Sequence, residues 1–173
     1  MYLSTSSTLL KDRRMPHTHE LGLHLILIPR IGSMLPMDNH DAISSSVHRI
    51  AYEHKLHCAA VHAREDHLHI LTAVGGDADI PEFIGSLLDG LRRELRRTGA
   101  HMTGFEWDEG VHVTLLPPWH LEIMASFVRD QDRYHEHKTL ENELDEVFRP
   151  NSAVGQATST PTARTTESAL CVN

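Results

Sequence analysis

The chain has 173 residues, which is enough for one ordinary domain and too few for two of typical size. Its formal net charge is −8, whereas proteins that coat nucleic acid without sequence preference usually carry an excess of lysine and arginine. No apolar run approaches the roughly 20 residues that span a bilayer, and the N-terminus lacks a secretory pattern, so we expect a cytoplasmic protein with no membrane partner.

The first part of the chain predicts an arm, a strand and a helix. Residues 1–18 begin with Ser and Thr and show no sustained apolar period, which predicts a flexible arm. Residues 21–29 are apolar and end in proline, which predicts the first strand. Asp38 or Asn39 can cap the helix that follows, and its apolar period continues to about Lys55.

Two further strands and a long helix are predicted next. Residues 57–63 and 67–74 read as strands on either side of a charged turn, and we expect them to pair as a hairpin. The first of them contains Cys58; with Cys171 it makes two cysteines, too few for a disulfide framework, so we expect free thiols. A helix then begins near Asp79, and Gly99 follows it as a natural stop.

The last elements are a strand, a helix and a tail. Residues 111–116 predict a strand that two prolines end, and residues 119–134 predict a third helix. Residues 149–173 are rich in Ser, Thr, Ala, Gly and Pro and predict a disordered tail. The apolar positions of the third helix expected to face the core are Ile123, Met124, Phe127 and Val128.

The order of these elements predicts the fold class. Strand, helix, strand, strand, helix, strand and helix within residues 19–148 form a split βαβ unit. We therefore expect a single α+β domain of the ferredoxin-like type, with a mostly antiparallel sheet and helices packed on one face. Many functions share this fold, so function has to be argued from particular residues.

Two histidines in the second hairpin strand are the first candidate site. Alternate residues of a strand share a face, so His67 and His69 should project together and can offer neighbouring nitrogens to one divalent cation. The competing interpretation is chance, because a chain with 15 histidines also repeats this spacing at His17/His19 and His135/His137. Those two pairs lack an apolar strand around them.

Four arginines on the second helix form a basic ridge. Their i, i+4 spacing places them in two neighbouring rows, which could contact a phosphate backbone. A solvated helix face, offset by Asp89 and Glu94, is an equally plain interpretation. The four residues are Arg92, Arg93, Arg96 and Arg97.

Several segments between residues 20 and 148 carry, in a fixed order, a resemblance to a known family. The segments are the strand around His24, Asp66-His67-Leu68-His69, the helix at 84–95, residues 105–110, residues 127–131 with His135 beyond, and the acidic 140–144. Together they resemble the IS200-like family of single-tyrosine, HUH-type transposases, which includes transposases associated with repetitive extragenic palindromes.

The resemblance implies a metal site and a DNA substrate. The two strand histidines and a glutamine of the last helix would hold a divalent cation, Mg²⁺ or Mn²⁺, through His67, His69 and Gln131. The cation would polarise a phosphodiester of single-stranded or hairpin DNA, which a tyrosine hydroxyl attacks to form a 5′-phosphotyrosine. The resemblance further implies a homodimer.

The nucleophile of that family is missing at its expected position. The tyrosine normally lies four residues before the glutamine, and here that residue is Phe127, which has no oxygen to form the covalent bond. Tyr134 is a weak replacement, because it lies seven residues later and would enter from the other side of the site. The resemblance therefore implies a transposase relative that lacks the nucleophile at residue 127.

Other functions stay open. The chain can be a domesticated protein that binds hairpin DNA without cleaving it, a nuclease in which water replaces the tyrosine, or a dimer that no longer binds DNA. His112-Val113-Thr114 matches one half of the paired His-x-Thr signature of 2H phosphoesterases, and the second half is absent. His67-Leu68-His69 also resembles part of the histidine-triad motif, which fails because Leu71 takes the third position.

Overall fold

The computed structural model describes residues 21–98 and 104–148. The predicted N-terminal arm, the C-terminal tail with Cys171, and Gly99 lie outside the described residues. The chain divides into two compact units, residues 1–138 and 139–173, and each is described by itself. Within the described ranges, no helix combines the length and the apolar character that crossing a membrane requires.

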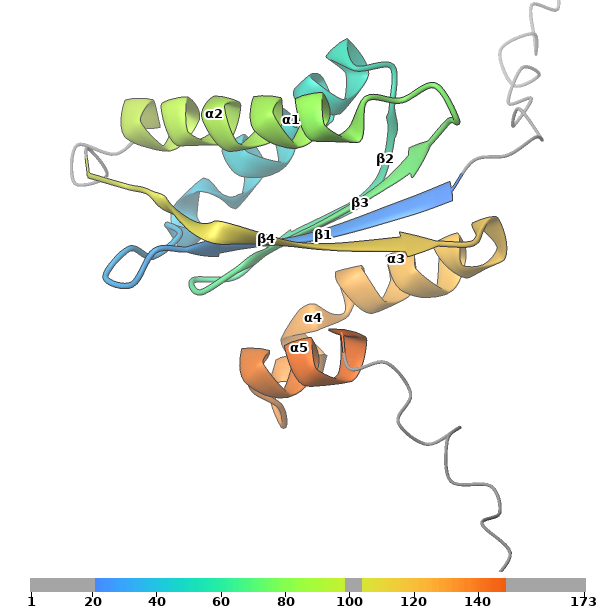
Figure 1. The fold of residues 1–173 in the computed structure, drawn as a ribbon. Coiled ribbons are helices and arrows are strands. Elements are labelled where there is room, and N and C mark those ends of the chain that lie inside the picture. The colour runs from blue at the N-terminus through green and yellow to red at the C-terminus, as the bar shows by residue number, and fades with distance from the viewer. Residues whose placement is uncertain (1–20, 99–103, 149–173) are drawn as a thin grey trace, which may run out of the picture. The chain divides into compact units, whose positions relative to one another are not determined.

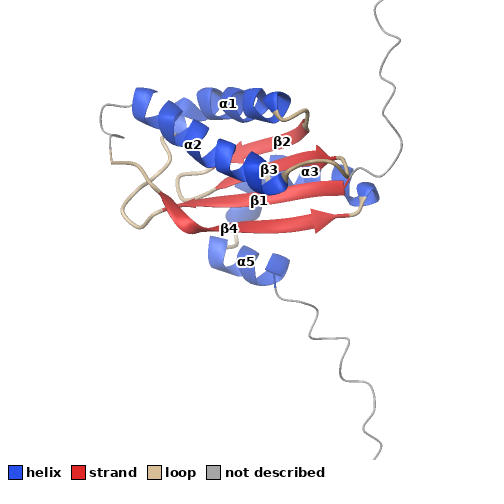
Figure 2. Ribbon diagram, turned by 45° about the horizontal axis from the view of Figure 1, so that its top comes forward, coloured by secondary structure: helices blue, strands red, loops and turns tan. Residues whose placement is uncertain are grey.

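Four strands form one antiparallel sheet in the first unit (Figure 2). Their order is β2-β3-β1-β4, so β1 and β3 are central and β2 and β4 are the edges. The predicted α+β class, the hairpin and the split βαβ order are confirmed. The strands are β1 (Leu21–Pro29), β2 (His57–Ala63), β3 (Leu68–Val74) and β4 (Trp107–Leu116).

Helices cover both faces of this sheet, which corrects the prediction that all of them lie on one face. Figure 1 shows α1 and α2 above the sheet and α3 below it. β3 is buried along its whole length, so both of its faces need a covering layer. The helices of this unit are η1 (Met37–Asn39), α1 (His40–Glu53), α2 (Ile80–Thr98), η3 (Pro118–His120), α3 (Leu121–Arg129) and α4 (Gln131–His135). The second unit contains α5 (Leu140–Phe148).

The two faces carry separate apolar cores. The larger core joins α1 and α2 to strand residues such as Leu25 and Ile70, whereas the smaller one joins α3 to Leu71. Because strand residues alternate between faces, Leu71 and His69 point to the α3 side and Ile70 to the other. The histidines therefore lie on the face that α3 covers.

Local chemistry explains where the two long helices begin and end. The Asp79 carboxylate accepts a hydrogen bond from the Glu82 N–H at 2.9 Å and so caps the start of α2. At the end of α1, Lys55 has φ 59°, and the Leu56 N–H donates to the Ala51 carbonyl at 2.8 Å. This is the Schellman arrangement that ends helices, here with lysine in the place usually taken by glycine.

The predicted helix over 119–134 is two helices with a break at Asp130. Asp130 has φ −93° and ψ 18°, outside the helical region, and aspartate is a poor helix former because its side chain competes for backbone hydrogen bonds. Ile123, expected in the core, is 70% exposed, so the prediction for that residue is wrong. The break matters for the site, because Gln131 starts a new helix.

The Cys58 thiol should resist modification in the folded protein. Burial raises its pKa to about 12 from an ordinary value of 9.0. In a Cys171→Ser variant, we expect slow labelling of Cys58 by a thiol reagent at pH 8 and fast labelling in denaturant, because only the thiolate reacts.

The same shift predicts the direction of an alkaline effect on stability. The unfolded thiol loses its proton near pH 9 and the folded one near pH 12, so the free energy of unfolding falls as the pH rises from about 9 towards 12. Chemical denaturation of the Cys171→Ser protein between pH 8 and 11, beside a variant that also carries Cys58→Ala, measures this contribution. Rapid native labelling at pH 8 would contradict the burial of the thiol.

Candidate metal centre

Two histidines at the start of β3 and one from the adjacent strand form a buried group. His67 precedes β3 directly and His69 lies within it, and both side chains are fully buried. In the β1–β3 register, Ile26 lies opposite His69 and His24 opposite Leu71, which places His24 on the same sheet face. His24 is fully buried as well.

Hydrogen bonds hold the first two rings in a defined orientation. The His67 Nδ1–H donates to the Asp66 Oδ1 at 2.7 Å. His69 Nδ1 and His24 Nε2 share a hydrogen bond at 3.0 Å, and the two rings stack with centroids 5.2 Å apart at an angle of 8°. Metal-binding histidines usually use their second nitrogen in this way, which fixes the ring and its tautomer.

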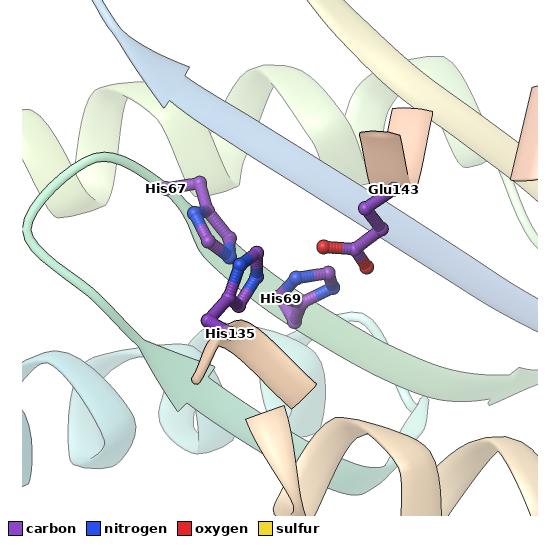
Figure 3. A group of neighbouring side chains, drawn as sticks. All are labelled: His67, His69, His135 and Glu143. Atoms are coloured by element: carbon purple, nitrogen blue, oxygen red, sulfur yellow. The ribbon is translucent and has the colours of Figure 1, made fainter. Parts of the chain in front are cut away.

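A third imidazole comes from α4. The ring of His135 lies 4.8 Å from that of His67, measured between centroids. Its Nδ1–H donates to the Lys138 carbonyl at 2.9 Å. His67, His69 and His135 can each offer one nitrogen such that the nitrogens lie within 4.8 Å of one another, and Figure 3 shows the three rings turned towards a common point.

A second group of contacts ties α4 and α3 to the edge strand β2. Asp132, in the first turn of α4, accepts hydrogen bonds from Arg64 Nη1 at 2.6 Å and from His62 Nε2 at 3.3 Å. Arg129, at the end of α3, donates to the Ala59 carbonyl at 3.2 Å. These long-range contacts place the helices that carry Phe127 and His135 over the histidine face of the sheet.

His62 is a partly buried neighbour of this group. It lies directly opposite His69 in the β2–β3 register. Burial lowers its pKa below the ordinary value of 6.5, and the nearby Asp132 carboxylate opposes this by favouring the charged form. His62 also contacts His40 of α1, with ring centroids 5.8 Å apart.

Gln131, the third ligand expected from the resemblance, begins α4 and is fully buried. It lies four residues before His135, so both residues belong to the same side of this short helix. The structure thus brings the helix of Gln131 to the predicted histidines, and ligation by its amide oxygen stays a prediction.

Phe127 occupies the side of the site where the resemblance expects a hydroxyl. Its ring meets the His69 ring edge to face, with centroids 6.3 Å apart. The Tyr134 ring lies 5.2 Å from the Phe127 ring and 5.3 Å from the His135 ring, measured between centroids. Tyr134 is therefore a neighbour of the site.

The predicted basic ridge on α2 is offset by acidic groups. Arg92 pairs with Asp89 at 3.1 Å, and Arg96 and Arg97 pair with Glu106 and Glu94. α2 also covers the sheet face opposite to the histidines. Contact of Arg92, Arg93, Arg96 and Arg97 with DNA stays a prediction, and such a contact would lie on the other side of the sheet from the metal centre.

Sequence reasoning missed three members of this site. His24 has a usable signal, because it is a polar residue inside an otherwise apolar strand. His135 follows Gln131 at i+4, which is a signal only once Gln131 is taken as a ligand. Asp132 has no signal in the sequence, since its partners Arg64 and His62 lie 68 and 70 residues away in the chain.

The donor set fits a divalent metal ion. Imidazole nitrogens, buried and held by hydrogen bonds from the other ring nitrogen, suit zinc, nickel, copper and related ions. A site of this kind on a rigid strand keeps its geometry better than one on a loop. The residues present therefore agree with the prediction of a divalent metal site, whereas the kind of ion, predicted as Mg²⁺ or Mn²⁺, has to be argued separately.

The comparisons with known proteins concern the fold. No family model matches the sequence, and no curated protein matches it at a significant level. A solved structure of a candidate transposase from Deinococcus radiodurans matches with a TM-score of 0.51 and 19% identity over 72% of this chain and 96% of the other. The chain accordingly shares its fold with this transposase structure.

A second solved structure also matches this chain. It is a REP-associated tyrosine transposase bound to a REP hairpin, with a TM-score of 0.51 and 10% identity over 97% of this chain and 100% of the other. At these identities the likeness establishes the fold alone, and what the chain does has to come from its site.

Proposed function

We propose that this protein is a transposase relative that binds single-stranded or hairpin DNA and holds a divalent cation at His67 and His69, with Gln131 beside them. The observation that carries the proposal is the buried histidine pair, with rings held by Asp66 and His24, on the sheet face covered by α3. The likeness to a transposase solved with a hairpin supports the choice of DNA.

The proposed function stops short of strand transfer. A divalent cation bound here would polarise a phosphodiester. Phe127 lies beside His69 where the attacking hydroxyl is expected, and a phenyl ring cannot form a phosphotyrosine. The chain therefore has the histidines that would hold the metal, and lacks the group that would join DNA to protein at residue 127. A homodimer belongs to the proposal on the resemblance alone, and a cytoplasmic location on the sequence pattern alone.

A second candidate function has one specific observation in its favour. Tyr134 lies next to both Phe127 and His135, so a hydroxyl does exist at the rim of the site. If Tyr134 replaced the missing nucleophile, the protein would be an active transposase with a relocated tyrosine. The place of Tyr134 in the chain, seven residues after the position expected for the tyrosine, argues against this.

Incubation with labelled hairpin DNA separates these functions. We expect the full-length protein with Mg²⁺, Mn²⁺ or Zn²⁺ to retain a hairpin oligonucleotide on a native gel. On a denaturing gel we expect no covalent adduct, with or without protease treatment. The matched control is the His67→Ala/His69→Ala double variant, which should lose the metal-dependent part of DNA retention.

The other outcomes are equally informative. An adduct that Tyr134→Phe removes would establish the relocated nucleophile and refute binding without covalent chemistry. Cleavage without an adduct would indicate hydrolysis by water. Absence of both binding and cleavage with hairpin and single-stranded DNA would refute the proposed function.

A further inference from the structure

We infer that the metal site is a three-histidine centre, in which His135 joins His67 and His69 as a ligand, and that it selects a transition-metal ion of the zinc type over Mg²⁺. This inference deepens the proposed function and rests on it only in that the same site holds a metal. It requires no DNA, so the two can fail independently.

The first support is the position of the three side chains. One nitrogen of each ring lies within 4.8 Å of the others. Tetrahedral zinc with bonds of about 2.1 Å needs its nitrogen ligands about 3.4 Å apart. The nitrogens therefore need to approach one another by at most about 1.4 Å, which side-chain rotations can supply.

The second support is the orientation of the rings. Each of the three imidazoles uses Nδ1 for a hydrogen bond within the protein: to the Asp66 carboxylate, to His24 and to the Lys138 carbonyl. Each ring thus has Nε2 as the nitrogen it can direct to a metal. Partners from three separate segments of the chain bind the three rings through the same nitrogen, Nδ1, which is the pattern expected around ligating histidines.

His24 acquires a defined role from this arrangement. For His69 to offer a lone pair at Nε2, its proton has to be on Nδ1, so His69 donates to His24 Nε2 in the bond of 3.0 Å. His24 then carries its own proton on Nδ1. It is a positioning residue that sets the tautomer of His69.

The chemistry of the donors decides the class of ion. Mg²⁺ prefers oxygen ligands and near-ideal octahedral geometry, and it gives up its water reluctantly. Imidazole binds zinc, nickel, copper and cobalt far better. A set of three nitrogens leaves the fourth position of a tetrahedral ion for a further ligand, as in open zinc sites.

The contacts around α4 hold His135 in a defined position near the other two histidines. The Asp132 carboxylate, bound to Arg64 and His62, secures the first turn of α4 to β2. Because α4 has only five residues, securing its first turn also restricts His135 at its last position.

Metal titration of the full-length protein tests the inference. By isothermal titration calorimetry without DNA, we expect Zn²⁺ and Co²⁺ to bind at least a hundredfold more tightly than Mg²⁺. We expect His135→Ala to weaken Zn²⁺ binding roughly a hundredfold, and Gln131→Ala to weaken it less. The matched control is His137→Ala, a histidine two residues later that is exposed and should leave binding within twofold.

A spectroscopic measurement keeps the test valid if a variant folds poorly. Co²⁺ in a four-coordinate, nitrogen-rich site absorbs strongly in visible light, and His135→Ala should lose this absorption while circular dichroism shows its helices intact. The inference is overturned if Mg²⁺ binds as tightly as Zn²⁺, or if Gln131→Ala costs more Zn²⁺ affinity than His135→Ala does. Zinc binding that depends on His135, without retention of hairpin DNA, would refute the proposed function and leave the inference standing.

Discussion

Phe127→Tyr is expected to produce a covalent protein–DNA adduct with hairpin DNA and a divalent metal, where the natural protein forms none. The ring of Phe127 already lies against His69, so the substitution adds a hydroxyl beside the proposed metal. A nucleophile accounts for several orders of magnitude of rate in enzymes that form covalent intermediates, so we expect adduct formation to rise roughly a hundredfold or more. Denaturing gels with labelled DNA measure it.

Two controls isolate the new hydroxyl. The Phe127→Tyr/Tyr134→Phe double variant should form the adduct as well as the single variant does, because Tyr134 is not required. Adding His67→Ala and His69→Ala should abolish it. An adduct at Tyr134 in the natural protein, or a stable, folded Phe127→Tyr variant that binds DNA and forms no adduct, would contradict this account of the site.

Phe83→Ala is expected to be the most damaging single change to the fold. Phe83 is fully buried near the start of α2, and its ring meets His54 at the end of α1 with centroids 5.6 Å apart. Truncation leaves a cavity between the two helices, which costs about 3–5 kcal/mol of unfolding free energy. Since domains are stable by only about 5–15 kcal/mol, chemical denaturation should show a large fall in the midpoint.

An exposed aromatic residue of α1 gives the matched control. Tyr52 is 82% exposed, so Tyr52→Ala should change the unfolding free energy by no more than about 0.5 kcal/mol. Phe83→Leu should fall between the two, because it retains most of the apolar volume. Equal effects of Phe83→Ala and Tyr52→Ala would mean that the α1–α2 core is not organised around Phe83.

The order of the elements could be predicted because each one has a local signature. The strand Leu21–Pro29 has its predicted limits, since a short apolar run with proline at its end has few alternatives. β4 starts earlier than predicted, at Trp107, because Trp107 pairs with Pro29 of β1 beyond a register shift, while the polar residues Asp108 to Gly110 give no strand signal in the sequence. Strand propensity depends only on residues close together in the chain, whereas the pairing partners determine where a strand ends.

The site was only partly accessible to such reasoning. His67 and His69 could be found because a period of two on an apolar strand is visible in the sequence. The side chains that hold these rings in place could not be found in this way, since the hydrogen bond between His24 and His69 joins residues 45 positions apart. The contacts that hold α4 beside β2, between Asp132 and both Arg64 and His62, likewise join residues far apart in the chain, so no local pattern encodes where His135 lies.

By itself, the sequence determined the α+β order, the histidine pair on one strand face, and the absence of a hydroxyl at residue 127, because each depends on local periodicity or on the chemistry of a single side chain. Only the tertiary structure decided that helices cover both sheet faces and that α2 with its arginines lies away from the histidines. It also decided that His135 and His24 join them. These features depend on register and on long-range contacts such as Asp132 with Arg64, whose formation reflects the packing of the whole sheet.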